Sequence, residues 1–387
     1  MTPLSVVDLA SALIGFDSVS SRSNLAVVDY IERYLASYGV AARRFPNADG
    51  TKAALFATIG PHDRGGVCLS GHLDVVPVEG QPWSHDAFDA RVIDGRLYGR
   101  GACDMKGFVA TALALVPELT KADLTVPVHL CFSYDEEVSC LGSVDVIARF
   151  GLELPRPILC IVGEPTLMEV VNAHKGLSTF TTTITGKAGH SSIPEAGVNA
   201  VFASARLLVE LETIAQELRT QIDPTGQFAP PYSSVHVGKA GGGIAVNTIP
   251  DTASILWECR ALPGFDIDSV AQRLDRFAAE QLLPAMQQIA PEADISTVRL
   301  VNVPGLAAQP GSNLEHLVLS IAGRSSAHAV SYGTEAGHFQ AAGVPTLVCG
   351  PGSIAQAHQA DEWVEISQLD ACLDFLRRLI ATLNTPD

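Results

Sequence analysis

The segment Gly66-Val-Cys-Leu-Ser-Gly-His-Leu-Asp74 joins a short apolar run to a histidine and an aspartate. The run 66–70 is typical of a strand, and polar residues follow it at once. Two further apolar runs, 126–134 and 157–162, also lead directly into acidic residues. Short, continuously apolar runs indicate strands buried on both faces. Predicted strands alternate with helical segments such as 106–119, so we expect an α/β domain whose mixed sheet is covered by helices on both faces.

The middle of the chain has a different pattern. Strands are predicted at 181–185, 232–237, 254–259 and 295–301, and long helices at 198–218 and 268–289. Their order, β-α-β-β-α-β, is that of a ferredoxin-like α+β unit. Strand-like runs then resume, and a final helix is expected to open with Ser367 and Asp370. The simplest topology is a catalytic domain formed by residues 1–177 and 303–387, interrupted by an inserted lid of residues 178–302.

The composition favours a folded, acidic enzyme. Of the 387 residues, 47% are hydrophobic and 17% are charged, which suffices for a large core. The net charge of −17 argues against nucleic acid or an anionic membrane as a partner, because both would repel the chain. No apolar run approaches the ~20 residues of a membrane helix. Residues 1–16 lack the basic start of a signal peptide, and we expect a cytoplasmic protein.

The eight cysteines do not indicate disulfides or a thiolate metal site. Most lie inside apolar runs, where cysteine behaves as a small hydrophobic residue, and no Cys-x-x-Cys pair is present. Cys103 and Cys140 lie beside acidic motifs, but carboxylate-rich sites rarely use thiolates. We predict that both are packing neighbours and not ligands.

Acidic or histidine-bearing segments stand at the predicted strand ends. They are Ser70-Gly-His72-Leu-Asp74, Gly101-Ala-Cys-Asp104-Met, Asp135-Glu136-Glu137 and Gly163-Glu164-Pro, and His358 follows near the C-terminus. Singly, each could be a surface turn, a helix-capping aspartate or a solvated acidic turn. The carboxyl ends of strands in an open α/β sheet, however, converge on one crevice. Acids gathered there would repel one another without a cation, so the set predicts a site for divalent cations.

The residue types suggest separate tasks within such a site. His72 and Asp74 are two apart, so the imidazole could bind metal while the carboxylate orients its other nitrogen. Asp104 lies among glycines that permit a close approach, and its two oxygens could bridge two cations. Glu136 and Glu137 are neighbours whose side chains diverge, so one could bind metal while the other reaches a water molecule.

With these motifs the chain resembles the family of di-zinc aminoacylases and exopeptidases, which includes acetylornithine deacetylases, succinyl-diaminopimelate desuccinylases and glutamate carboxypeptidases. The resemblance covers nearly the whole chain. It rests on residues 70–77, 99–107, 134–142 and 163–166, and on Gly189-His-Ser-Ser192, Asn247-Thr-Ile-Pro250 and Gly333-Thr-Glu335. Within the family, the acetylornithine deacetylase subgroup is most similar, on Gln81-Pro-Trp83, Asp104-Met-Lys-Gly-Phe108, His174-Lys-Gly176 and Gln356-Ala-His358.

The resemblance implies a di-metal centre with zinc as the first expectation and cobalt or manganese as alternatives. His72 and Glu164 would complete one metal, Glu137 and His358 the other, and Asp104 would bridge them. Glu136 would be the general base and acid, and Asp74 the partner of His72. The resemblance also implies a cis peptide bond after Asp104.

The implied reaction is hydrolysis of the amide of an N-acyl amino acid. The first expectation is N2-acetyl-L-ornithine, converted to L-ornithine and acetate in arginine biosynthesis. His190 would stabilise the oxyanion, Arg260 would bind the substrate carboxylate, and Asn247, Lys175 and Thr334 would donate hydrogen bonds. Glu335 could meet a substrate ammonium group.

Relatives dimerise through the lid, which implies a homodimer. Three alternatives remain open: another deacylase of the family, such as a succinyl-diaminopimelate desuccinylase or an exopeptidase; a non-catalytic metal- or ligand-binding protein; and a di-metal phosphatase, which would need more histidines and cationic anchors.

Overall fold

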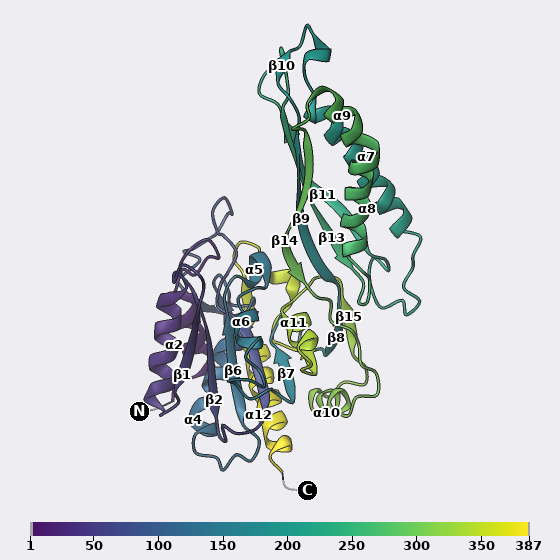
Figure 1. Cartoon of the computed structure of the whole chain (residues 1–387). Coiled ribbons are helices and arrows are strands. Elements are labelled where there is room, and N and C mark those ends of the chain that lie inside the picture. The colour runs from purple at the N-terminus through teal and green to yellow at the C-terminus, as the bar shows by residue number, and fades with distance from the viewer. Residues whose placement is uncertain (1–2, 386–387) are drawn as a thin grey trace. The chain divides into compact units, whose positions relative to one another are not determined.

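The computed structural model describes residues 3–385 and divides the chain into two compact units (Figure 1). Unit 1 comprises Met1–Ala173, Leu306–Ala329 and Thr334–Asp387, and unit 2 comprises His174–Gly305 and Val330–Gly333. Unit 1 therefore draws on both ends of the chain, with unit 2 inserted between them. Across the described residues, no helix has the combination of length and hydrophobicity needed to cross a bilayer.

An eight-stranded mixed sheet with the order β1-β2-β6-β3-β7-β16-β8-β15 forms the centre of unit 1. In chain order these strands are β1 (Ala42–Pro46), β2 (Ala53–Ile59), β3 (Val67–His72), β6 (Val128–Ser133), β7 (Leu159–Val162), β8 (Val171–His174), β15 (His328–Val330) and β16 (Thr346–Val348). The neighbours β6, β3, β7 and β16 are parallel. Parallel strands end at the same edge of a sheet, so the loops that follow these four strands are brought together.

Alternate residues of the central strands face opposite sides of the sheet. Leu69 and Leu130 belong to the main core, which the helices α1 (Val6–Ile14), α2 (Leu25–Ser37), α3 (Lys106–Ala114), α4 (Val116–Leu119), α10 (Asn313–Ala322) and α12 (Ile366–Leu383) complete. On the other side lie α6 (Val144–Ile147) and α11 (Ala336–Ala341). There Phe150 contacts both Phe56 and Phe339. The expected α/β sheet with helices on both faces is thus confirmed.

The helix ends show where local sequence rules held and where they failed. Ser5 and Asp8 form a reciprocal capping box at the start of α1. Asn24 occupies the cap position of α2, but its amide instead bonds the backbone N–H and C=O of Ala53, each at 2.9 Å. The cap of α12 is Glu365, so the prediction that this helix opens at Ser367 was wrong. The helix predicted at 106–119 is divided at Leu115 into α3 and α4.

A small three-stranded sheet of order β17-β5-β4 flanks the acidic loops of unit 1. Its strands are β4 (Arg91–Ile93), β5 (Arg96–Tyr98) and β17 (Trp363–Glu365). The strand β17 pairs antiparallel with β5, which brings the C-terminal region beside the segment that precedes Asp104. The short helices α5 (Glu136–Ser139) and η3 (Ile354–Gln356) lie in loops that carry candidate site residues.

Unit 2 has the ferredoxin-like order expected from the sequence. Its sheet, β11-β13-β9-β14, is antiparallel throughout and contains β9 (Gly176–Thr185), β11 (Ser234–Gly242), β13 (Thr252–Ala261) and β14 (Asp294–Val303). The helices are α7 (Ala200–Leu218), α8 (Asp268–Phe277) and α9 (Leu283–Ile289), and a π-helical segment (Ala278–Leu282) joins the last two. Further short elements are β10 (Gly189–His190), β12 (Thr248–Ile249) and η1 (Pro194–Ala196).

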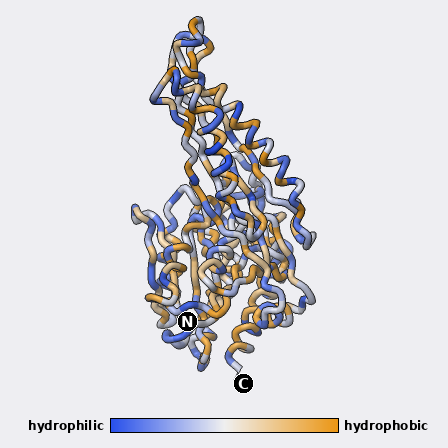
Figure 2. The backbone as a smooth tube through the Cα atoms, turned by 45° about the vertical axis from the view of Figure 1, so that its right-hand side comes forward, coloured by the Kyte–Doolittle hydropathy of each residue, from blue (hydrophilic) through white to orange (hydrophobic). Residues whose placement is uncertain are grey.

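The helices of unit 2 cover one face of its sheet (Figure 1). Buried residues of α7 recur every three or four positions. In Figure 2 apolar and polar colours alternate along the helices of unit 2. On the covered face Phe180 stacks on Trp257 with 4.3 Å between ring centroids, and the indole N–H donates to Thr182. The opposite face is more open, since Leu256 and Val298 are exposed.

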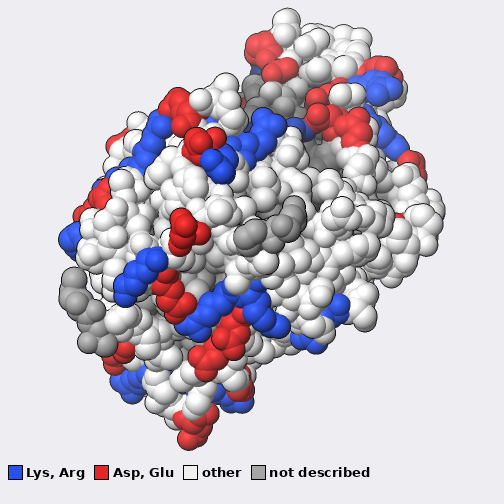
Figure 3. All heavy atoms as spheres, turned by 90° about the horizontal axis from the view of Figure 1, so that it is seen from below, with Lys and Arg blue, Asp and Glu red and all other residues white. Residues whose placement is uncertain are grey.

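Charged side chains of both signs lie next to one another on the surface that Figure 3 shows. Exposed ion pairs of the protein include Arg64 with Asp63 and Arg377 with Glu118. Each contributes about 0–1 kcal/mol, because water screens it. Stability therefore rests mainly on the two apolar cores.

Candidate metal centre

The loops at the carboxyl edge of the unit 1 sheet carry all seven residues that the sequence predicted for a metal centre in this unit. His72 is the last residue of β3, and Asp74 follows it; Glu136 and Glu137 open α5 after β6; Glu164 follows β7. Asp104 lies in the loop between β5 and α3, and His358 follows η3. The topology places these residues together because β6, β3 and β7 are parallel neighbours.

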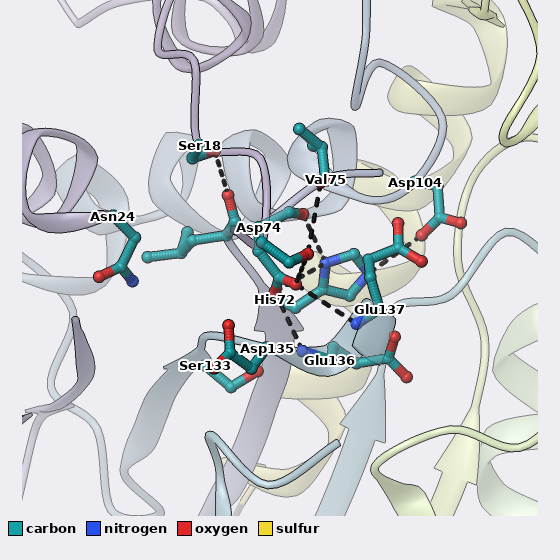
Figure 4. Close-up of polar contacts among 12 residues, drawn as sticks. Ser18, Asn24, His72, Asp74, Val75, Asp104, Ser133, Asp135, Glu136 and Glu137 are labelled. Atoms are coloured by element: carbon teal, nitrogen blue, oxygen red, sulfur yellow. Dashed lines mark hydrogen bonds and ion pairs between the residues drawn. The ribbon is translucent and has the colours of Figure 1, made fainter. Parts of the chain in front are cut away.

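Asp104 lies between the two imidazoles. Its Oδ1 is 3.0 Å from His72 Nε2, and its Oδ2 is 3.3 Å from His358 Nε2 (Figure 4 shows the contact with His72). His358 Nε2 is also 2.9 Å from Glu137 Oε2, and His72 Nε2 is 3.8 Å from Glu164 Oε1. The peptide bond between Asp104 and Met105 is cis, as the family resemblance implies. One carboxylate thus faces two imidazoles, each with a second carboxylate beside it.

The protonation pattern of His72 shows that this arrangement suits a cation. Nδ1 lies 2.9 Å from the backbone carbonyl of Asp74, an acceptor only, so Nδ1 carries the hydrogen. In the neutral imidazole the lone pair of Nε2 then points at the Asp104 carboxylate. Two acceptors 3.0 Å apart repel each other unless a proton or a metal ion lies between them.

Two buried carboxylate oxygens supply a second indication. Among the described residues, Glu137 Oε1 and Glu164 Oε1 have no hydrogen-bond partner. A buried polar atom without a partner costs about 1–3 kcal/mol, and more if it is charged. Candidate ligand atoms of His72, Asp104 and Glu137 lie within 4.8 Å of one another, as do those of His72, Glu136 and Glu164. The residues present therefore fit divalent cations.

Electrostatic shifts point the same way. Burial and the nearby Asp104 raise the pKa of Glu137 to about 7, and burial with the same neighbour holds the pKa of Glu164 well above its usual value. Burial alone would lower the pKa of His72, but Asp104, Glu136 and Glu164 outweigh it and raise that pKa well above the usual value. Hydrogen bonds to Asp104 and Glu137 raise the pKa of His358 to about 10. The acids of the cluster thus stabilise positive charge in their midst, either protons on the imidazoles and carboxyls or a bound cation.

Asp74 contacts more groups than the sequence predicted. Its carboxylate lies 3.6 Å from His72 Nδ1, whereas its backbone carbonyl accepts the imidazole hydrogen. The carboxylate also accepts hydrogen bonds from the N–H groups of Glu136 and Glu137, at 3.1 and 3.3 Å (Figure 4). A third hydrogen bond comes from the Ser20 hydroxyl at 2.7 Å. The contact of this carboxylate with the imidazole has the length of a loose ion pair, and its orienting role stays a prediction. The backbone of Asp74 orients His72, and its carboxylate holds the start of α5.

Glu136 does not take part in the imidazole–carboxylate contacts of His72 and His358 described above. Its Oε1 is 3.1 Å from Cys140 Sγ, a thiol that burial keeps protonated by raising its pKa well above the usual value. Burial raises the pKa of Glu136 to about 8, with Glu137 and Asp104 adding to the effect and His72 opposing it. A carboxylate held by a weak donor near the His72 imidazole is suited to exchanging a proton.

Comparisons with known proteins agree with this geometry. Residues 68–382 match peptidase family M20/M25/M40. The chain belongs to that family. Relatives include the acetylornithine deacetylase of Myxococcus xanthus, 35% identical over 95% of each chain, and that of Proteus mirabilis (strain HI4320), 32% identical over 94% of this chain and 91% of the relative.

Solved structures of the M20 family show the same fold. The metallo-carboxypeptidase Sso-CP2 from Sulfolobus solfataricus has a TM-score of 0.77 at 17% identity, covering 98% of this chain and 99% of the other. The YXEP protein of Bacillus subtilis, described as a dinuclear metal binding peptidase, has a TM-score of 0.66 at 15% identity over 98% and 97% of the two chains.

Four of the remaining site candidates of this M20-family chain lie in unit 2, namely Lys175, His190, Asn247 and Arg260, and Thr334 lies in unit 1. His190 is exposed; its Nδ1 accepts a hydrogen bond from the Ser192 N–H at 3.2 Å, so Nε2 carries the hydrogen of the neutral ring. Arg260 lies on the open face of the sheet, and its Nε donates to Glu258 at 2.9 Å. Asn247 is exposed, and its backbone carbonyl accepts a hydrogen bond from the Ser191 N–H.

Lys175 and Thr334 already have partners that suggest structural tasks. The ammonium group of Lys175 donates to the carbonyls of Pro230 and Tyr232 at 2.7 and 2.8 Å. The hydroxyl of Thr334 accepts the Ala336 N–H at the start of α11. These contacts do not support the substrate-binding roles predicted for the two residues.

Glu335 is also engaged elsewhere. Its two oxygens accept hydrogen bonds from the hydroxyls of Ser70 and Ser133, at 2.6 and 2.8 Å, and the side chain is buried. The idea that it meets a substrate ammonium group is therefore not supported.

The sequence reasoning missed two residues that support the centre. Ser20 binds the Asp74 carboxylate, and Lys52 pairs with Asp135 at 2.5 Å while also donating to the carbonyl of Ser20. Neither lies in a recognisable motif, because these contacts span from 32 to 83 positions along the chain. Cys103 contacts the carbonyl of Ser353, and all eight cysteines are free thiols.

Proposed function

We propose that this chain is a metal-dependent amidohydrolase that cleaves N-acyl amino acids, with N2-acetyl-L-ornithine as its preferred substrate and L-ornithine and acetate as products. The observation that carries the proposal is the placement of Asp104 between His72 and His358, each with a second carboxylate close by. The relatives called acetylornithine deacetylases, which match over nearly the whole chain, support the choice of substrate and a place in arginine biosynthesis.

We propose His72, Glu164 and Asp104 as ligands of one divalent cation, and Glu137, His358 and Asp104 as ligands of a second. Zinc is the first candidate, with cobalt or manganese as alternatives, since imidazole and carboxylate ligands accept all three. When bound, a pair of such cations supplies Lewis-acid charge that polarises a carbonyl and makes water more acidic. The partnerless oxygens of Glu137 and Glu164 support this ligand set.

Glu136 is the proposed general base and acid. The raised pKa of its carboxyl, about 8, would fall toward neutrality when cations are bound, because positive charge favours the carboxylate. The carboxylate then accepts a proton from the attacking water and returns it to the nitrogen of the leaving amine. One proton is thus taken up and released in each turnover, and Glu136 ends as it began.

We propose that His190 stabilises the negative charge that develops on the amide oxygen. Its Nε2 carries a hydrogen in the neutral ring, because Nδ1 already accepts from Ser192. We propose Arg260 and Asn247 as contacts for the substrate carboxylate, since a guanidinium group binds carboxylates with two parallel hydrogen bonds. A His190→Asn change should lower kcat much more than it raises KM; an unchanged kcat would contradict the role.

A homodimer formed through unit 2 is also part of the proposal. Unit 2 exposes large apolar side chains on α7 and near β12, namely Phe202, Val209, Ile244 and Val246. Contiguous apolar surface on a folded protein commonly marks a contact with another chain. Light scattering on a size-exclusion column should give twice the mass of one chain, and the double change Phe202→Glu with Val209→Glu should give the mass of one.

The release of acetate and of succinate from matched substrates tests the function. N2-acetyl-L-ornithine, N-succinyl-diaminopimelate and a panel of other N-acyl amino acids would be compared with and without a chelator. We expect acetate release that depends on metal and is fastest with acetylornithine. Faster succinate release would assign the chain to the desuccinylases. No release from any substrate, by protein shown to contain two ions per chain, would favour a binding protein over an enzyme.

A further inference from the structure

A buried carboxylate outside the proposed ligand set holds the backbone around Asp104. Glu362 Oε1 accepts hydrogen bonds from the N–H groups of Cys103 and Asp104, at 2.9 and 3.0 Å. Its Oε2 accepts from the Gly101 N–H at 3.1 Å and from Arg100 Nη1 at 2.7 Å. Three amides of the loop that carries Asp104 thus converge on one side chain from the C-terminal region.

This carboxylate is buried as a charged group. The Glu362 and Arg100 side chains are each 1% exposed. Burying such a pair carries a desolvation cost of several kcal/mol per ion. An apolar pair of similar size could fill the same space, but it could not accept hydrogen bonds from three backbone amides. The presence of a buried carboxylate at Glu362 is therefore explained by its hydrogen bonds to the Asp104 loop and not by the packing of its side chain.

A second branch of the same network reaches the loop of His358. Arg100 Nη2 donates to Gln81 Oε1, and Gln81 Nε2 donates to the backbone carbonyl of His358 at 2.8 Å. Arg100 Nη1 also lies 3.3 Å from the carbonyl of Gln359, the next residue. The guanidinium group therefore connects the two segments that carry Asp104 and His358.

We infer that Glu362 and Arg100 are positioning residues of the metal centre: Glu362 fixes the backbone at Asp104, and Arg100, through Gln81, fixes the backbone at His358. The inference rests on the proposed roles of Asp104 and His358 as ligands. A bridging carboxylate tolerates little displacement, because one group must satisfy two cations at once. Residues that orient ligands in this way typically account for about 10–100-fold in metal affinity.

Substitutions in the two branches of the network should affect metal binding differently. Glu362→Gln keeps one oxygen acceptor but places an NH2 group against a backbone N–H and Arg100, so it should disturb the bridging position and weaken the binding of both ions by about 10–100-fold. Gln81→Leu breaks only the branch to His358 and should weaken one ion far more than the other. Leu379→Ala, a truncation in the buried core of α12, is the matched control for lost stability alone.

Zinc affinity, measured by competition with a chromophoric chelator, and the visible spectrum of the protein loaded with Co²⁺ are the readouts. We expect Glu362→Gln to change both, and Leu379→Ala to lower the melting temperature while leaving affinity and spectrum as in the wild type. Wild-type affinities and spectrum in folded Glu362→Gln would overturn the inference. If Glu362→Gln does not fold, folded Gln81→Leu decides it: wild-type affinity for both ions would overturn the inference, and selective loss of one would support it.

The proposed function and this inference fail in distinguishable ways. A wild-type chain that binds no divalent ion would refute the metal centre itself. A wild-type chain that binds two ions, with variants that bind them equally well, would refute only the positioning roles.

Discussion

Glu136 can be separated from the metal ligands by substitution. Glu136→Ala should keep both metal ions, because the side chain contacts Cys140 and is not one of the proposed ligands. Turnover should fall by about 10²–10⁴-fold, the range for loss of a general base or acid. Metal content by plasma emission spectrometry and kcat on acetylornithine would be measured on the same sample. A variant with ordinary kcat would exclude the role as base.

His358 should behave in the opposite way. Its Nε2 lies near both Asp104 and Glu137, so His358→Ala should leave about one ion per chain after dialysis and abolish most activity. His328→Ala is the matched control, because His328 is 57% exposed and its nearest acid is Glu169 at 3.7 Å. Two ions retained by His358→Ala would contradict the ligand assignment.

His129 predicts a pH effect on stability that is independent of the metal. It is buried in β6, its Nδ1 lies 3.0 Å from the Thr58 hydroxyl, and burial lowers its pKa to about 4. The unfolded chain, with a histidine pKa near 6.5, therefore binds this proton over a range where the native chain does not. Stability from this residue is present above pH ~6.5 and is lost progressively as the pH falls toward ~4.

Urea unfolding of the chelated protein at pH 7, 6 and 5 tests this effect. The free energy of unfolding should fall less steeply for His129→Gln than for the wild type, by an amount on the order of 1–3 kcal/mol at pH 5. His328→Gln serves as the exposed control and should follow the wild type. Parallel curves for His129→Gln and the wild type would refute the account.

At the level of single residues, the sequence predicted which side chains gather at the centre but not how each is held. His72, Asp104, Glu137, Glu164 and His358 stand next to strand ends or glycines, which are local signals. The contacts of Asp74 with Ser20 and the α5 amides, and of Glu362 with the Asp104 loop, join segments far apart in the sequence. No local pattern encodes such contacts, because they depend on how the loops pack.

Among the secondary-structure elements, α5 illustrates a cap supplied from elsewhere in the chain. This helix has four residues, and its cap residue Asp135 makes no side-chain capping bond. The Asp74 carboxylate takes that place by accepting the N–H groups of Glu136 and Glu137. The position of the proposed base therefore depends on a residue from a different strand end.

Asp74→Ala should displace α5 and Glu136 with it. We expect kcat to fall by about 10–100-fold, as for other residues that orient a functional group, and stability to fall by about 1–3 kcal/mol from the lost buried hydrogen bonds. Asp63→Ala, which removes an exposed carboxylate paired only with Arg64, is the control. Unchanged kcat and melting temperature in Asp74→Ala would show that α5 needs no such cap.

Strands and helices with strong periodicity were predicted well. The strand β7 ends at Val162, as expected from the sequence, and α7 differs from its prediction only at its start, where Asn199 caps the Phe202 N–H. The prediction failed where a single pattern continues through a break. The apolar spacing of residues 268–289 is uninterrupted, yet a π-helical segment separates α8 from α9. Backbone irregularities of this kind leave the apolar face intact and are therefore invisible to periodicity.

For the whole molecule, metal should contribute measurably to stability. A ligand present at 100 times its dissociation constant stabilises the native state by about 2.7 kcal/mol per site. Two sites would contribute roughly twice that amount, so a chelator should lower the melting temperature by about 5–10 °C. Scanning calorimetry with and without chelator would measure the shift, and added zinc should reverse it.

The variants provide internal controls for that shift. Glu136→Ala should lose as much stability on chelation as the wild type, because it keeps the proposed ligands. His358→Ala should lose less, since it begins with fewer ions. Equal melting temperatures for the wild type with and without chelator would mean that the centre does not hold metal under these conditions.

The discontinuity of unit 1 has a consequence for synthesis on the ribosome. Unit 2, apart from Val330–Gly333, is one continuous stretch that emerges early enough to form its own core. The strand β16, His358 and Glu362 emerge only after almost all of unit 2 has been synthesised. At about 5–20 residues per second, roughly 10–40 seconds pass between the synthesis of Glu164 and that of His358. During this time Asp104, Glu136, Glu137 and Glu164 lack the second imidazole of the proposed centre. We therefore expect hydrolytic activity only after the proposed ligand His358 has emerged, and products truncated before this residue should be inactive.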